Sequence, residues 1–243
     1  MTNNLQIKDV FFDLDHTLWD FDKNSMLAYK RVFNKFEIDV DFDDFIKIYE
    51  PINLAYWKKF REERITKEEL RRGRLIDSFK IFNKEYATIT IDKLADSYIE
   101  ELPIDNYLFD GALNILDYLN EKYQLHIITN GFEEVQFKKL NNSGILHYFS
   151  TVTTSEEVGL KKPNPKVFLT ALNKANSFPT QSVMIGDSLE ADILGANNIG
   201  MQTIFYNYRN ESISKKIKSI DSLLEIKNYI NCIILVIVNQ CVF

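Results

Sequence analysis

Short apolar runs alternate with helical patterns along much of the chain, and three of these runs end at a polar residue. The three runs, each with the residue that follows it, are 10–12 before Asp13, 125–128 before Thr129 and 183–186 before Asp187. Runs of this length, rich in branched and aromatic residues, are typical of buried strands in a parallel sheet. Weaker runs predict two further strands, at 203–206 and 150–153.

Helical patterns separate these runs. One covers 133–142 and stops near Gly144, and another covers 164–176. Strand and helix in alternation predict an α/β fold with a doubly wound, Rossmann-like parallel sheet. Ligands of such sheets bind outside the carboxyl ends of the strands, where the polar residues after the three runs would gather.

The stretch between the first two strands has a different character. Aromatic and aliphatic residues recur there at helical spacing, and Thr66 with Glu69 has the form of a capping box. Pro51 interrupts one of the helical patterns, where a bend is expected. We therefore predict an inserted α-helical bundle, a cap domain, over 21–103. The predicted core comprises 1–20 and 104–231, and an apolar tail of unknown role covers 232–243.

The composition is that of an ordinary globular protein, with a formal net charge of −6 that disfavours binding to a nucleic-acid polymer. No secretion signal is visible, and the apolar run 232–238 is far shorter than a membrane span, which needs about 20 residues. The two cysteines, Cys232 and Cys241, are interpreted as incidental thiols. We expect a cytoplasmic protein without a membrane partner, either a monomer or a weak homo-oligomer.

Two aspartates separated by one leucine follow the first run. In an extended chain Asp13 and Asp15 would share one face, whereas a turn after Asp13 would move Asp15 outward but keep it within reach of a bound group. Crowded carboxylates suggest Mg²⁺, which prefers oxygen ligands. Asp187 is a natural third ligand, and Asp192 follows it five residues later.

Anion-binding groups complete the pattern. Thr129, Asn130 and Gly131 lie where the second strand passes into a helix, whose N-terminal N–H groups bind anions. Lys162, in a loop with two prolines, could bring a compact positive charge. A metal, an anion cradle, a lysine and a free carboxylate together favour phosphoryl transfer, with one aspartate as nucleophile and another as acid and base.

These motifs resemble those of the haloacid dehalogenase superfamily, specifically its phosphatases with a helical C1 cap inserted after the first motif. Residues 13–17 (DLDHT) resemble the first motif, Thr129 the second, Lys162 the third and 186–192 (GDSLEAD) the fourth. All four occur in order, and the resemblance covers nearly all of 5–230.

The resemblance implies a role for each matching residue. Asp13 would form a phosphoaspartate, and Asp15 would protonate the leaving oxygen and then deprotonate the hydrolytic water. The Asp13 carboxylate, the Asp15 backbone carbonyl and Asp187 would hold Mg²⁺, while Asp192 would support the metal from behind these ligands or through a water.

The resemblance also implies the phosphate-binding residues. Thr129, Asn130, Gly131 and Lys162 would bind the phosphoryl oxygens. Lys162 is preferred over Lys161 because the lysine of the family directly precedes the proline.

Two stretches, 11–25 and 64–71, look most like bacterial pyrimidine 5'-nucleotidases, which implies a pyrimidine nucleoside monophosphate as the substrate. A phosphosugar phosphatase or phosphomutase of the same superfamily is the alternative. Asp15 argues against dehalogenation, because a leaving halide needs no proton. A phospho-accepting signalling module is disfavoured, since such a module is about half this length and has no inserted bundle.

Several other residues have less specific interpretations. His16, His126 and His147 are interpreted as structural. Trp19 and Phe21 are expected to pack at the hinge between core and cap, with stacking on a substrate base as the alternative. Arg71, Arg72 and Arg74 are expected on a solvated helix face, although one of them could reach the substrate.

Overall fold

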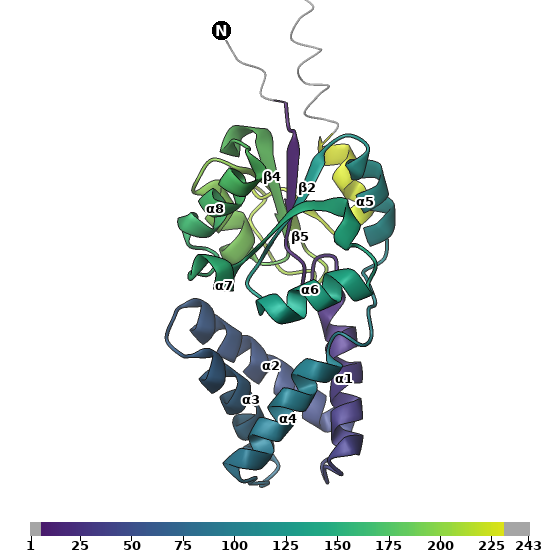
Figure 1. The fold of residues 1–243 in the computed structure, drawn as a ribbon, viewed down its shortest axis with the longest axis vertical. Coiled ribbons are helices and arrows are strands. Elements are labelled where there is room, and N and C mark those ends of the chain that lie inside the picture. The colour runs from purple at the N-terminus through teal and green to yellow at the C-terminus, as the bar shows by residue number, and fades with distance from the viewer. Residues whose placement is uncertain (1–5, 231–243) are drawn as a thin grey trace, which may run out of the picture. The chain divides into compact units, whose positions relative to one another are not determined.

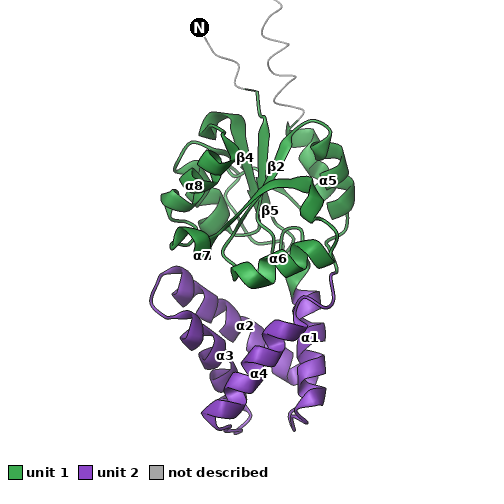
Figure 2. Cartoon of the chain, in the orientation of Figure 1, with its two compact units in different colours: residues 1–21, 107–243 green, residues 22–106 purple. Residues whose placement is uncertain are grey.

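The computed structural model describes residues 6–230, so the predicted apolar tail and both cysteines lie outside the described residues. The chain divides into two compact units (Figure 2). Unit 1 comprises Met1–Phe21 and Tyr107–Phe243, and unit 2 comprises Asp22–Asn106. Within the described part of the chain, none of the helices combines the length and the apolar character that crossing a membrane requires.

Unit 1 is built on a six-stranded sheet in the order β3-β2-β1-β4-β5-β6, and all neighbouring strands are parallel (Figure 1). The strands are β1 (Asp9–Phe12), β2 (Gln124–Thr129), β3 (Phe149–Thr154), β4 (Ser182–Gly186), β5 (Gln202–Tyr206) and β6 (Ser219–Ile220). This confirms the predicted doubly wound α/β fold, including the two strands with weaker signals. The sequence missed β6, because two residues are too few to show a pattern.

Helices cover both faces of this sheet, with α5 and α8 on opposite sides (Figure 1). The helices of unit 1 whose two ends lie within 6–230 are α5 (Ala112–Asn120), α6 (Glu133–Asn142), α7 (Ser155–Val158), α8 (Pro165–Ala175) and α9 (Gly195–Asn197), with the π-helical turn η3 (Leu189–Leu194) and the short 3₁₀ turns η1 (Leu146–Tyr148), η2 (Pro179–Gln181) and η4 (Leu223–Glu225). The predicted helix 133–142 coincides with α6, and Gly144 beyond its end has φ 72°, a left-handed conformation that favours glycine.

Residues 10–12 of the central strand β1 are apolar because both faces of the strand are covered. Phe11 packs with Val167 and Phe168 of α8, and successive strand residues alternate faces, so Val10 and Phe12 point to the opposite side. All three are fully buried. Burial on both faces explains the continuous apolar run before Asp13 and fixes the end of β1 in the middle of the sheet.

The strand order reverses between β1 and β4, since β2 and β3 lie on one side of β1 while β4, β5 and β6 lie on the other. The carboxyl ends of β1, β2 and β4 lead directly into Asp13, Asn130 and Asp187. The candidate residues are therefore gathered at the switch point, where ligands of doubly wound sheets bind.

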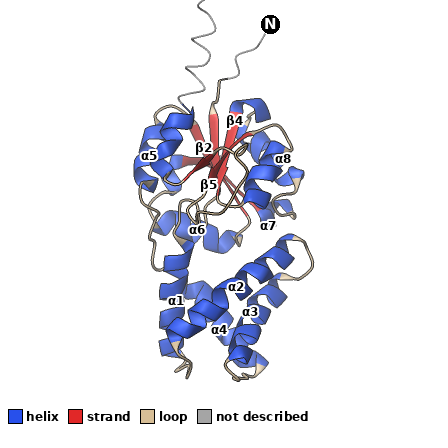
Figure 3. Cartoon of the chain, turned by 180° about the vertical axis from the view of Figure 1, so that it is seen from behind, coloured by secondary structure: helices blue, strands red, loops and turns tan. Residues whose placement is uncertain are grey.

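Unit 2 is entirely helical in its regular elements (Figure 3). Its helices are α1 (Phe21–Lys35), whose first residue belongs to unit 1, α2 (Phe42–Arg61), α3 (Lys67–Ile81) and α4 (Thr88–Glu101). The predicted capping box at the start of α3 is present, with Thr66 accepting from the Glu69 N–H and Glu69 accepting from the Thr66 N–H. Helix α2 continues as one helix through Pro51.

The core of unit 2 is rich in aromatic rings, as the helical spacing predicted. Tyr29, Phe45 and Phe79 are buried, and Tyr29 stacks on Tyr98 with ring centroids 4.0 Å apart. Not every apolar residue of these helices is in the core, since Met26 of α1 is 39% exposed.

The prediction for Arg74 is wrong. Its side chain is buried, and its Nη1 donates to Asn53 Oδ1 at 2.8 Å. The guanidinium carbon lies 5.2 Å from the ring centroid of Tyr98 and 5.9 Å from that of Tyr49. Arg71 and Arg72 do form ion pairs at the surface, with Asp96 and Asp92. Helical spacing alone did not show that the third arginine points inward.

Candidate active site

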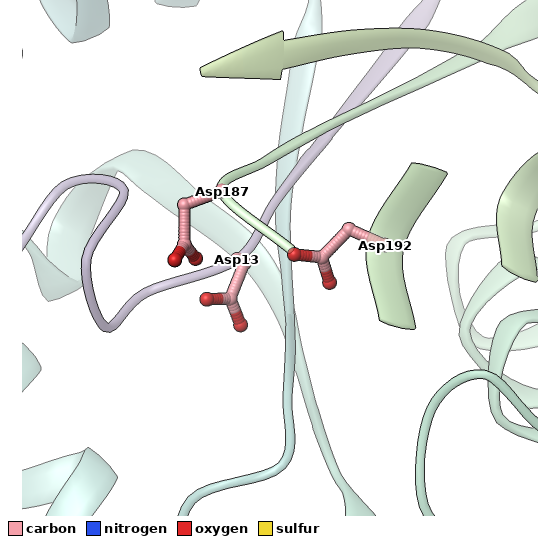
Figure 4. A group of neighbouring side chains, drawn as sticks. All are labelled: Asp13, Asp187 and Asp192. Carbon is pink, nitrogen blue, oxygen red and sulfur yellow. The ribbon is translucent and has the colours of Figure 1, made fainter. Parts of the chain in front are cut away.

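Three carboxylates from two segments converge at the carboxyl edge of the sheet (Figure 4). Asp13, Asp187 and Asp192 each offer an oxygen, and the three oxygens lie within 4.8 Å of one another. Asp13 follows β1, Asp187 follows β4, and Asp192 lies in η3. The chain thus brings together the three side chains that the sequence proposed around a metal.

Asp13 is held firmly. Its backbone N–H donates to the Ile185 carbonyl at 2.9 Å, which extends the pairing of β1 with β4 by one residue. Its carboxylate accepts from Lys162 Nζ at 2.6 Å. Burial raises the pKa of Asp13 from 3.8 to about 7, against the lowering effect of Lys162 and with a further increase from Asp192.

Lys162 lies between two of the carboxylates. Its Nζ is 2.6 Å from Asp13 Oδ1 and 2.7 Å from Asp192 Oδ1, and it also donates to the Ile128 carbonyl at 2.7 Å. Burial alone would lower the pKa of Lys162, but Asp13 and Asp192 together raise it above its ordinary value. The two carboxylates therefore favour the charged form of this buried ammonium.

Asn130 fixes the loop that carries this lysine. Its carboxamide donates to the Lys162 carbonyl at 3.0 Å and accepts from the Lys162 N–H at 2.8 Å. The sequence suggested Asn130 as a phosphate-binding residue. Its side chain is committed to the Lys162 backbone, so a phosphoryl contact by Asn130 would fall to its backbone N–H.

Asp187 and Asp192 are the other two carboxylates of the cluster. Asp192 Oδ2 accepts from the Ser188 N–H at 3.0 Å, and Thr17 Oγ1 donates to Asp187 Oδ1 at 3.4 Å. A Cβ at position 186 would overlap the Asp192 carboxylate, which explains why a glycine ends β4. Burial and the neighbouring charge of Asp13 raise the pKa of Asp187 well above its ordinary value.

Asp15 lies apart from this cluster. The Leu14 carbonyl accepts the N–H groups of Leu18 and Trp19, so the chain turns just after Asp13. Of the two arrangements that the sequence left open, the turned one is found. The Asp15 carboxylate accepts from Lys139 Nζ at 2.6 Å and from Gln136 Nε2 at 3.0 Å.

Gln136 and Lys139 are two site residues that the sequence reasoning missed. Both are buried on α6, and burial lowers the pKa of Lys139 although Asp15 opposes this effect. The signal was present: two long polar side chains three residues apart lie on the buried face of a helix that follows Thr129 directly.

Thr129 and Gly131 complete the edge. Thr129 Oγ1 accepts from Gln136 Nε2 at 2.7 Å and from the Gly131 N–H at 3.1 Å. With its accepting positions filled, the hydroxyl proton of Thr129 is directed to an outside acceptor such as a phosphoryl oxygen.

The other interpreted residues play supporting roles. His16 has φ 62°, and its Nδ1 lies 2.8 Å from the Tyr208 hydroxyl. His126 Nε2 lies 3.1 Å from Asp9 Oδ1, and its Nδ1 lies 2.8 Å from Thr151 Oγ1. Trp19 is fully buried with Lys139 Nζ 4.2 Å from its ring centroid, which leaves its face covered and unsuited to stacking on a substrate base.

The donor set suits a hard divalent cation. All three convergent ligands are carboxylates, and oxygen is the donor that Mg²⁺ prefers. One lysine faces three carboxylates there, and burial together with the neighbouring charges raises the pKa of Asp13 and Asp187, so a cation would relieve the remaining repulsion. The residues present therefore fit Mg²⁺.

Comparison with known proteins agrees with this geometry. The family model for haloacid dehalogenase-like hydrolases matches residues 10–206. The chain is 33% identical over 199 residues to the pyrimidine 5'-nucleotidase YjjG of Escherichia coli, covering 82% of this chain and 85% of the relative. It is 36% identical over 202 residues to the pyrimidine 5'-nucleotidase PynA of Streptococcus pneumoniae, covering 82% and 84%.

Another relative has a different named substrate. A glyceraldehyde 3-phosphate phosphatase of Methanothermobacter thermautotrophicus is 31% identical over 209 residues, covering 83% of this chain and 86% of the relative. Among solved structures, the HAD-hydrolase YfnB of Bacillus subtilis, bound to magnesium, superposes with a TM-score of 0.85 at 28% identity, covering 93% of this chain and 99% of that one.

Proposed function

Because the chain is a phosphatase of the haloacid dehalogenase-like hydrolase family, we propose that it is a Mg²⁺-dependent phosphomonoester hydrolase that forms a phosphoaspartate on Asp13. One observation carries the proposal. A buried aspartate at the switch point of the sheet lies against Lys162 and within one cluster with Asp187 and Asp192, while a second aspartate, Asp15, lies two residues on with its own partners.

In the first step a carboxylate oxygen of Asp13 attacks phosphorus and the bond from phosphorus to the ester oxygen breaks. Asp15, protonated at this stage, gives its proton to the departing oxygen, so the product leaves as an alcohol. The Lys162 ammonium and the Thr129 hydroxyl stabilise the charge on the phosphoryl oxygens.

In the second step a water attacks the phosphorus of the phosphoaspartate, and Asp15, now ionised, takes a proton from that water. The bond between phosphorus and the Asp13 oxygen breaks, which releases inorganic phosphate and regenerates both carboxyl groups. Asp13 and Asp187 would hold Mg²⁺ directly, and Asp192 would support the metal from behind these ligands or through a water. The Asp15 carbonyl is a further proposed ligand. When bound, the cation supplies positive charge for the nucleophile and the phosphoryl group.

For the substrate we propose a pyrimidine nucleoside monophosphate such as dUMP or dTMP. Support comes from the two nucleotidase relatives, each of which matches more than four fifths of the chain. The glyceraldehyde 3-phosphate phosphatase relative favours a second candidate, a small phosphosugar or triose phosphate, with the same chemistry.

The test is phosphate release by purified, metal-stripped protein, with and without added Mg²⁺. The substrate panel contains dUMP, dTMP, purine nucleoside monophosphates, glyceraldehyde 3-phosphate and hexose phosphates. We expect Mg²⁺-dependent turnover with the pyrimidine nucleotides ahead. Greater turnover of the sugar or triose phosphates would overturn the substrate while retaining the chemistry.

Two variants test the mechanism in the same assay. Asp13→Asn removes the attacking oxygen and should abolish turnover. Asp15→Asn should retain only a small fraction of the wild-type turnover. Asp13→Asn with wild-type turnover would refute the phosphoaspartate.

A further inference from the structure

Two side chains of α6 hold the Asp15 carboxylate from different sides. Lys139 Nζ donates to Oδ1 at 2.6 Å, and Gln136 Nε2 donates to Oδ2 at 3.0 Å. Each oxygen therefore has its own partner, and rotation of the carboxyl group would break both hydrogen bonds. Both partners are buried, with exposed fractions of 0% for Gln136 and 2% for Lys139.

Gln136 also connects Asp15 to the phosphate-binding edge. The same Nε2 that contacts Asp15 donates to Thr129 Oγ1 at 2.7 Å. A Cβ at position 131 would overlap the Gln136 carboxamide, so the glycine leaves the space that this side chain occupies. Gln136 thereby holds the Asp15 carboxyl group and the Thr129 hydroxyl at a fixed separation.

Lys139 is itself held in place by its surroundings. Its Nζ lies 4.2 Å from the ring centroid of Trp19 and 5.0 Å from that of Phe21. When ionised, the Asp15 carboxylate is the ion-pair partner of this buried ammonium. Since α6 begins four residues after Thr129, one rigid element positions both polar side chains relative to β2.

We propose that Gln136 and Lys139 are positioning residues for Asp15, which hold its carboxyl group in line for proton transfer to the leaving oxygen and from the hydrolytic water. The inference rests on the proposed function, because it assigns Asp15 the role of acid and base. Neither residue contacts the phosphoryl group in this role.

The experiment compares kcat/KM for two substrates of different leaving-group quality, dUMP and p-nitrophenyl phosphate, in Lys139→Met and Gln136→Leu. The nucleoside alcohol needs a proton to leave, whereas p-nitrophenolate does not. We expect Lys139→Met to lose about 10²-fold in kcat/KM for dUMP and only a few-fold for p-nitrophenyl phosphate, with a smaller difference in Gln136→Leu.

A second readout concerns the hydrolysis of the phosphoaspartate. With Asp15 misplaced this step slows, so mixing Lys139→Met with p-nitrophenyl phosphate should give a burst of p-nitrophenol equal to the enzyme concentration, followed by slow turnover. In the Asp15→Asn background, Lys139→Met should add no further discrimination between the two substrates.

Lys138→Met is the matched control, since Lys138 is the exposed neighbour on the same helix and should leave both substrates unaffected. Equal losses for dUMP and p-nitrophenyl phosphate, in variants that remain folded by circular dichroism, would overturn the positioning role. If Lys139→Met does not fold, Gln136→Leu, which removes no charge, decides by the same ratio. A wild-type protein inactive on every phosphomonoester would instead overturn the proposed function.

Discussion

The two units bury their cations in opposite ways. In unit 1, Lys162 lies against Asp13 and Asp192, and Lys139 lies against Asp15, so each buried ammonium has at least one carboxylate. In unit 2, Arg74 is equally buried, but its contacts are the Asn53 carboxamide and the faces of Tyr49 and Tyr98; within 6–230 it forms no ion pair.

The difference distinguishes buried lysines that belong to a cluster of ionisable groups from a buried arginine that packs among neutral groups. In unit 1, burial and the neighbouring carboxylates raise the pKa of Asp13 and of Asp187, and a bound cation would stabilise the ionised form of both. A guanidinium among neutral hydroxyl, amide and aromatic groups has no such neighbours. Its planar shape lets it pack against rings and donate at its edge, so it organises a core.

Removing the lysine at the centre of the carboxylate cluster should have the largest effect. Lys162→Met is expected to lower kcat/KM by about 10³-fold, because the variant loses the positive charge that would face the phosphoryl oxygens and leaves Asp13 and Asp192 without their ammonium partner. Steady-state kinetics with dUMP at saturating Mg²⁺ checks this. Activity within threefold of wild type would place Lys162 outside the chemistry.

Removing the buried cation of unit 2 should change stability but not catalysis. Arg74→Met removes the shorter of the two hydrogen bonds to Asn53 Oδ1, leaving only the Tyr49 hydroxyl at 3.3 Å, and should lower the free energy of unfolding by about 2–3 kcal/mol, measured in urea. The value of kcat should remain within threefold. Arg71→Met, which removes a surface ion pair, is the control and should cost under about 1 kcal/mol. A large fall in kcat with unchanged stability would erase the contrast between the units.

The pH dependence of the stability of the metal-free protein tests the raised pKa of Asp13. The folded pKa of Asp13, about 7, lies above its ordinary value of 3.8, so the folded state binds the proton more tightly and loses stability as pH rises through this window. Asp13→Asn lacks this loss. Its stability relative to wild type should therefore increase by roughly 2–3 kcal/mol between pH 5 and pH 8.

Thermal unfolding in EDTA measures this difference, and excess Mg²⁺ should reverse it at pH 8 because the wild-type protein gains a bound cation. A relative stability that does not change between the two pH values in EDTA would contradict the raised pKa.

The smallest effect is expected at a site with no competing charges. Thr66→Ala removes the hydroxyl that accepts from the Glu69 N–H at the start of α3 and should cost about 1 kcal/mol, with unchanged kinetics. Thr66→Ser keeps the acceptor and should lie close to wild type. A loss in Thr66→Ser as large as in Thr66→Ala would show that the methyl group, not the cap, matters.

Much of the fold was predictable because its signals are local. Apolar runs marked five of the six strands, α6 coincided with its predicted range, and the Thr66 capping box was predictable from two residues. The strand-end positions of Asp13 and Asp187 followed from the same runs, since parallel strands place their carboxyl ends at one edge.

What escaped prediction depends on side chains meeting across the fold. The turn after Asp13 separates Asp15 from the carboxylate cluster and brings it to Lys139, 124 positions away in the sequence. Arg74 and its half-buried neighbours Arg71 and Arg72 have the same residue type in one helix, and the rings of α2 and α4 distinguish the one that is fully buried. Local patterns do not contain such pairings.

The central position of β1 has a consequence for the order in which the chain is made. Asp13 is translated before both partners of its strand, because β1 has β2 on one side and β4 on the other, and β4 ends at Gly186. The helices of unit 2, contiguous from 22 to 106, are complete long before then. During synthesis the strand that leads into Asp13 must therefore wait for β2 and then for β4, which pair with Asp9 at Gln124 and at Ser182, and the carboxylate cluster can form only after Asp192 has been translated.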